Sequence, residues 1–122
     1  MTTTIQKQII IRALSLIENE ENWTRGVLAR NTLGVRCEWN DADASKFCAI
    51  GALGRTAQDL VGDYFSAKQL ALEAAHIIMA TNDQAGWCLS SINDTDGHPA
   101  VVQLFKKTLE NWEGNGREPA GG

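Results

Sequence analysis

Four side chains of this sequence could together perform thiol chemistry if the fold brings them close. Cys48 lies in the first turn of a predicted helix, where free backbone N–H groups and the helix dipole lower the pKa of a thiol. His98 could serve as the base, with Asn93 or Asp94 orienting its imidazole ring, as in hydrolases that combine cysteine, histidine and asparagine. The chain carries no local motif of a thiol enzyme, and free cysteines are mostly buried, so we expect Cys48 to be packed. A small thiol hydrolase or transferase using Cys48 is the alternative.

No pattern in the sequence predicts a metal ion or a cofactor. The three cysteines, Cys37, Cys48 and Cys88, form no CxxC pair, and the two histidines form no HxxxH pair. The stretch 93–97 has the acidic and glycine residues of a calcium loop. The first and twelfth positions of such a loop would not be carboxylates here, which favours a simple turn instead. Glycine motifs that bind phosphate are also missing.

The composition indicates a single globular domain without general affinity for nucleic acid or membrane. The chain has 122 residues, 43% of them hydrophobic and 21% charged, with a net charge of −4. No run of three Lys or Arg occurs, whereas nucleic acid and anionic membranes favour basic patches. No apolar run approaches 18 residues, and no secretion signal is recognisable. We therefore expect a cytoplasmic protein with a protein partner, no direct nucleic-acid contact and no membrane contact.

The stretch Ser45–Val61 is predicted to be the helix around which the other segments are arranged. One side of its helical projection is a continuous apolar arc, suited to a core. The other side carries Cys48, Gly51, Ala52 and Arg55, which are too small for a core face and too apolar for open solvent. We expect another segment to cover this small side.

That cover is predicted to be a β-hairpin at about residues 24–39. Thr24–Arg30 and Val35–Trp39 flank the turn residues Asn31–Gly34, in which Asn and Gly supply left-handed conformations. Trp23 and Trp39 stand at the two ends of this segment and are expected to pack near each other or over the central helix. A hairpin alone is marginally stable in water, so it must dock on the helices.

The predicted fold is mainly α, a compact bundle of four principal helices with this small inserted hairpin. Residues 1–113 form the single domain, and the Gly-rich residues 114–122 are expected to be a disordered tail. Residues 87–92 are predicted to add one helical turn, followed by a loop over 93–97. Apolar periodicity predicts the other three principal helices, from a Thr3 or Thr4 cap to about Asn19, from a Ser66 cap to about Ala80, and from about Pro99 to Trp112.

Three short motifs are similar to those of an uncharacterised family of small bacterial and phage helical proteins. They are Trp-Thr-x-Gly at residues 23–26, Cys-Ala-x-Gly-Ala-Leu at residues 48–53, and Asn-Asp at residues 93–94. The similarity covers about residues 5–110. It implies a mainly helical cytosolic protein of bacterial or phage-like origin, and it supplies no activity.

The favoured functional hypothesis is a non-enzymatic interaction module that binds and modulates a protein partner. Its predicted partner-binding residues are Arg36, Trp39 and Arg55. A module encoded by a phage or mobile element, including an inhibitor of the anti-defence type, would fit this size and acidity. Besides the thiol enzyme, a second alternative is a helical bundle that binds a small ligand between the hairpin and the small side of helix 45–61.

Overall fold

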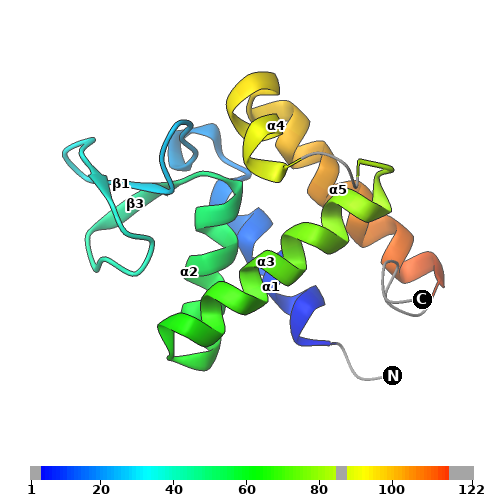
Figure 1. Cartoon of the computed structure of the whole chain (residues 1–122). Helices are drawn as coiled ribbons and strands as arrows, with labels where there is room; N and C mark the ends of the chain where they lie inside the picture. Colours follow the sequence, from blue (N-terminus) through cyan, green and yellow to red (C-terminus); the bar gives the residue numbers. More distant parts are fainter. Residues whose placement is uncertain (1–3, 85–87, 116–122) are drawn as a thin grey trace.

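The computed structural model describes residues 4–84 and 88–115, and the prediction of a mainly helical fold is confirmed. Figure 1 shows the helices packed together, with the strands extending to one side. The elements in chain order are α1 (Ile5–Ile17), the 3-10 helix η1 (Glu20–Asn22), β1 (Ala29–Asn31), β2 (Arg36–Cys37), β3 (Ala44–Phe47), α2 (Ala49–Val61), α3 (Tyr64–Thr81), α4 (Leu89–Asp96) and α5 (His98–Asn115).

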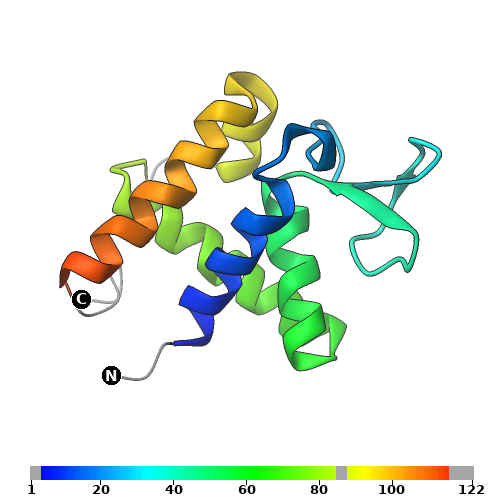
Figure 2. The same ribbon diagram turned by 180° about the vertical axis from the view of Figure 1, so that it is seen from behind.

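The helical core is built on α2, which packs against both α1 and α3, while α5 contacts α1, α3 and α4. Figure 2 shows α1 and α5 beside each other on the side that faces away from the viewer in Figure 1. Ala57 of α2 and Ala67, Ala71 and Ala74 of α3 are fully or almost fully buried, which allows the two helices to approach closely. The largest fully buried apolar side chains are Ile9, Ile10, Ile17, Leu53, Ile78, Val101 and Phe105.

Residues 93–96, which were predicted to lie in a loop, belong to helix α4, an α-helix in addition to the four principal ones predicted. Helix α4 continues to Asp96 and ends at Gly97, whose φ of 91° is readily adopted by glycine. The prediction was wrong because asparagine favours turns when its side chain competes for local backbone groups. The Asn93 side chain instead bonds mainly to other segments, so the helix can continue through it.

The predicted hairpin is present but belongs to a three-stranded antiparallel sheet in the order β2-β1-β3. Its strands β1 and β2 are shorter than predicted, and the third strand, β3, occupies the start of the stretch that was predicted as one helix. Helix α2 therefore begins at Ala49, with Cys48 as its N-cap. The correction has a physical cause: residues 44–47 pair with β1, and the Cys48 N–H donates to the carbonyl of Leu28.

The register of the sheet sorts its residues into an inner and an outer row. Residues directly opposite one another in antiparallel strands share one face. Ala29 lies opposite both Cys37 and Phe47, and the burial of Ala29 and Phe47 marks this row as the inner face. The next row, which faces outward, contains Arg36, Arg30 and Lys46.

The small side of α2 is covered by the segment around the hairpin, as predicted. A Cβ atom on Gly51 would lie only 1.9 Å from the carbonyl oxygen of Leu28. A Cβ atom on Gly54 would lie 2.5 Å from the indole ring of Trp39. Glycine at these two positions therefore sets how closely the hairpin base can approach the helix.

Substituting Gly51→Ala tests this close approach. Alanine raises helix propensity by about 1 kcal/mol relative to glycine, but here it must displace the backbone at Leu28. Overpacking of this kind costs about 1–3 kcal/mol, so we expect a lower free energy of unfolding in urea titrations. A Gly51→Ala variant that is more stable than the wild type would show that the backbone contact does not constrain the fold.

Predictions for the C-terminal end and for one connection fall partly outside the described residues. The predicted tail at 114–122 overlaps α5, whose backbone reaches Asn115, and residues 116–122 are not described. Trp87, the predicted start of a helical turn, also lies outside the described part. No helix among the described residues has the length and apolar character needed to cross a bilayer.

Candidate functional site

The amide of Asn93 lies at the junction of three chain segments and is fully buried. Its Oδ1 accepts hydrogen bonds from the indole Nε1 of Trp23 at 2.7 Å and from the backbone N–H of Ala49 at 3.0 Å. Its Nδ2 donates to the carbonyl of Thr24 and to Oδ1 of Asp94, both at 3.1 Å. All four hydrogen-bonding positions of the amide are thus used.

Asp94 extends the same junction toward the surface. Its Oδ1 accepts from the backbone N–H of Gly26 at 2.9 Å, and its carbonyl accepts from the Arg25 guanidinium at 3.2 Å. The guanidinium also lies over the indole of Trp23, 5.2 Å from the ring centroid. Gly26 has a φ of 83°, a conformation that side chains other than glycine rarely adopt. The three motifs noted in the sequence therefore meet at Asn93 and Asp94.

Cys48 occupies the N-cap of α2 as a packed residue with 4% exposure. Its Sγ accepts a hydrogen bond from the backbone N–H of Gly51 at 3.3 Å. Burial raises the pKa of the thiol above its ordinary value; the negative charge of Asp94 also raises it, and the backbone donors Gly51 and Ile50 only partly oppose this. The lowering expected from the helix end is therefore outweighed by desolvation.

His98 begins α5 and lies beside Trp23 rather than being bonded to the thiol. Its Nε2 is 2.6 Å from the carbonyl oxygen of Ile17, so it donates a hydrogen bond to α1. Its ring meets the Trp23 indole edge-on, with 5.6 Å between centroids. The structure thus places Asn93 and His98 against Trp23, and Asp94 beside Asn93 and the Gly26 backbone, where their hydrogen bonds join segments of the fold. The sequence had grouped these residues but gave no sign that Trp23 would be the neighbour of both Asn93 and His98.

The three predicted partner-binding residues occupy different environments. Arg36 is exposed on β2. Trp39 is only 3% exposed and stacks on Tyr64 of α3, with 5.3 Å between ring centroids. Arg55 donates to the carbonyls of Trp39 and Asp41, both at 3.0 Å. Trp39 and Arg55 therefore anchor the hairpin to the helices, and Arg36 is the residue of the three that is open to a partner.

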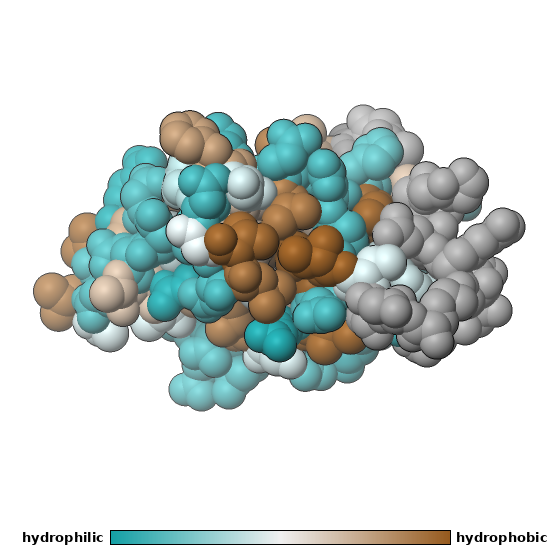
Figure 3. All heavy atoms as spheres, turned by 90° about the horizontal axis from the view of Figure 1, so that it is seen from below, coloured by the Kyte–Doolittle hydropathy of each residue, from teal (hydrophilic) through white to brown (hydrophobic). Residues whose placement is uncertain are grey.

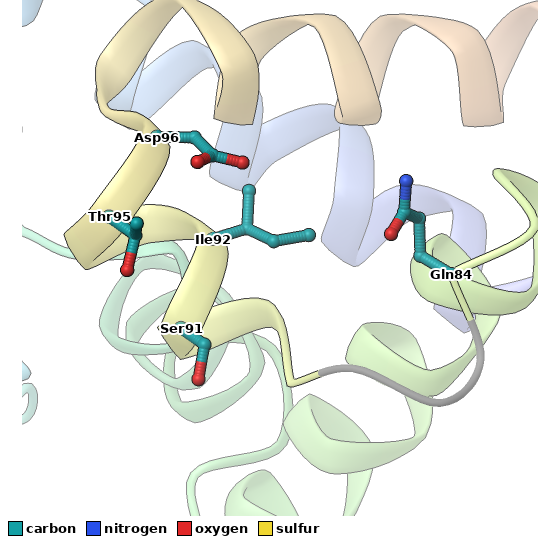
Figure 4. A pocket seen from close by; sticks show the side chains of 5 residues that line it. All are labelled: Gln84, Ser91, Ile92, Thr95 and Asp96. Atoms are coloured by element: carbon teal, nitrogen blue, oxygen red, sulfur yellow. The ribbon is translucent and has the colours of Figure 1, made fainter.

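At the seam where a small-ligand pocket was predicted, Gly51 and Gly54 bring α2 into close contact with Leu28 and Trp39. A hollow of about 400 Å³ opens beside this contact, with Leu28 and Ile50 in its lining. Another hollow, of about 350 Å³, lies beside α4 and is lined by Ile92 among polar side chains (Figure 4). Its polar members Ser91, Thr95 and Asp96 are exposed to solvent. Among residues 4–84 and 88–115, no group of three or more His, Cys, Asp or Glu is placed to hold a metal ion.

Removing the Asn93 amide tests whether it holds the junction together. In Asn93→Ala, the buried N–H groups of Trp23 and Ala49 and the Thr24 carbonyl lose their partner, and each such group costs about 1–3 kcal/mol. We expect the free energy of unfolding in urea to fall by at least about 3 kcal/mol. Asn19→Ala is the matched control, because the Asn19 side chain accepts one exposed hydrogen bond from Glu21 N–H. Equal losses in the two variants would contradict the role given to Asn93.

Alkylation by iodoacetamide, followed site by site with mass spectrometry, tests the state of Cys48. Exposed Cys88 is expected to react in the native protein, whereas Cys48 is expected to react only as fast as the protein unfolds. The pKa of the Cys48 thiol is higher in the folded than in the unfolded protein. The free energy of unfolding is therefore expected to fall as the pH rises above the unfolded thiol pKa of about 8.5. Native-state reaction of Cys48 with a midpoint below about 8.5 would instead indicate an activated thiol.

Comparison with known proteins assigns the chain to a family but does not assign it an activity. No curated protein and no solved structure matches the chain. The model of DUF6197, described as a family of unknown function, matches residues 1–111. The expectation of an uncharacterised family is therefore confirmed, and the chain belongs to DUF6197.

Proposed function

We propose that this protein is a binding module that presents its β1–β2 hairpin to a protein partner. The observation that carries the proposal is the exposure of apolar side chains at the tip: Leu33 is 84% exposed and Val35 is 56% exposed. The hairpin extends away from the helices, so nothing in the described chain covers its tip (Figure 1). Exposed apolar side chains at the end of a projecting element are typical of interaction surfaces.

The turn that carries these side chains is held by its own hydrogen bonds. Oδ1 of Asn31 accepts from the backbone N–H groups of Leu33 and Val35, at 2.9 and 3.0 Å. The backbone N–H of Asn31 donates to the Val35 carbonyl at 2.8 Å. A tip that is ordered before binding loses less conformational entropy when a partner docks.

The base of the hairpin is held by contacts with the helices. Trp39 is enclosed between Gly54 and Tyr64, and the Arg55 guanidinium fastens the backbone at Trp39 and Asp41. A rigid projecting arm on a helical body suits recognition better than chemistry. We extend the proposal to a cytoplasmic module that modulates its partner, and an inhibitor of the anti-defence type encoded by a phage or mobile element is one such role.

Other apolar side chains are exposed outside the hairpin, and they provide a control surface. Figure 3 shows an apolar area surrounded by hydrophilic residues on the face seen from below. On α3, Phe65 is 79% exposed and Leu72 is 53% exposed. These positions distinguish binding at the hairpin from general stickiness of apolar groups.

Photo-crosslinking inside the cells that encode the protein tests the proposal. A benzoylphenylalanine at position 33 is expected to give one discrete adduct, which disappears when Val35→Asp is added because a carboxylate disfavours apolar burial. The same probe at position 72 is the control and is expected to give no such adduct. Identical adducts from positions 33 and 72, or none from position 33 in the folded protein, would contradict the proposal.

A further inference from the structure

The outer face of the sheet places three cations side by side. Arg30 on β1 lies directly opposite Arg36 on β2 and directly opposite Lys46 on β3. Cβ atoms of such opposite residues are about 4.5–5.5 Å apart, so the three positions form one row across the strands. The residues are distant in the sequence, and only the register brings them together.

The positive charges of this row have no carboxylate partner in the described chain. Arg30 donates to the Thr24 hydroxyl at 2.9 Å and to the Gly34 carbonyl at 3.1 Å, and Lys46 donates to the Glu21 carbonyl. These acceptors are neutral, so they satisfy N–H groups without cancelling charge. Arg36 is exposed, and its side chain forms neither a hydrogen bond nor an ion pair with any of residues 4–84 and 88–115.

Such a row lowers the stability of the isolated protein. Like charges directly opposite one another in a sheet repel, whereas opposite charges there stabilise it. The chain as a whole carries a net charge of −4, so carboxylates are not scarce, yet none is paired with these three cations in the described part. The arrangement is explained if an anion from outside the chain faces the row.

The surroundings of the row favour acidic protein over nucleic acid. Proteins that bind duplex DNA neutralise many phosphates, and they extend a basic surface along the backbone. Here the row holds three cations on a chain with a net charge of −4, which is too few to follow a continuous phosphate backbone. The neighbouring apolar tip also suits a protein surface. A local group of carboxylates is the complementary partner.

We infer that Arg36, Arg30 and Lys46 bind an acidic segment of the protein partner, next to the apolar tip. This inference rests on the proposed function and names the chemistry of the partner. The acidic segment supplies carboxylates to the row, while Leu33 and Val35 supply apolar contact.

Fluorescence anisotropy with a labelled octaglutamate peptide tests the row directly. The variant R36E/K46E is expected to weaken peptide binding at least tenfold. K68E/K107E is the matched control: it changes net charge equally at exposed residues of α3 and α5 and is expected to weaken binding less than twofold. The inference is overturned by the absence of binding, by equal losses in the two variants, or by tighter binding of a single-stranded DNA octamer.

The single variant R36E separates lost binding from lost folding when its thermal midpoint and its peptide binding are both measured, because it leaves the Lys46–Glu21 hydrogen bond intact. A glutamate opposite Arg30 replaces repulsion by attraction, so the midpoint is expected to rise by a few degrees while binding falls. A lower midpoint would overturn the premise that the row is repulsive.

The crosslinking probe at position 33 distinguishes failure of this inference from failure of the proposed function. Adding R36E/K46E to that chain is expected to lower the adduct yield at least tenfold. An undiminished adduct would leave the proposed function standing and overturn the acidic partner. Absence of any adduct in the parent chain would contradict the proposed function, and the peptide titration would still decide whether the row binds carboxylates.

Discussion

The hydrogen bonds of the buried Asn93 amide join α4 to the start of α2 and to the segment that leads into the sheet. The amide uses all four of its hydrogen-bonding positions, and through them α4 is joined to the Trp23 indole, to the Thr24 carbonyl and to the first N–H of α2. These links fix where α2 begins and where the chain enters the sheet. Leu28 can then lie against Gly51, and the hairpin is held at its base. A side chain that could only donate or only accept would leave buried groups unpaired.

This junction also separates the residues that build the fold from those available for function. Trp23, Cys48 and Asn93 belong to the three motifs that carry the family resemblance, and all are buried in internal contacts. Their side chains are engaged in hydrogen bonds within the fold. The Cys48 thiol accepts one from the Gly51 N–H, and the Asn93 amide accepts one from the Trp23 indole. The apolar tip, with Leu33 and Val35, and the row of Arg36, Arg30 and Lys46 lie instead on the sheet. The functional surface is therefore proposed there, outside the motifs.

Helices α1, α3 and α5 were predictable because apolar residues recur at helical spacing along each of them. Ser45–Phe47 was assigned to a helix because so short a segment fits either a helix or a strand, and only pairing with β1 decides. Only the first half of helix α4 was predicted, as a turn over 87–92, because Asn-Asp composition favours turns unless the Asn93 side chain is engaged elsewhere. Grouping Asn93, Asp94 and His98 was possible from sequence. The cation row was not, because it depends on strand register.

The Asn93 amide fixes the junction of α4, α2 and the segment leading to the sheet. Native-state hydrogen exchange followed by NMR tests this role. The protons to observe are the Trp23 indole N–H and the Ala49 backbone N–H, which both donate hydrogen bonds to Oδ1 of Asn93. We expect both protons to exchange only through global unfolding, with the same free energy as the most protected core amides. Exchange of either proton at the rate of a solvent-exposed group, while the core remains protected, would contradict it.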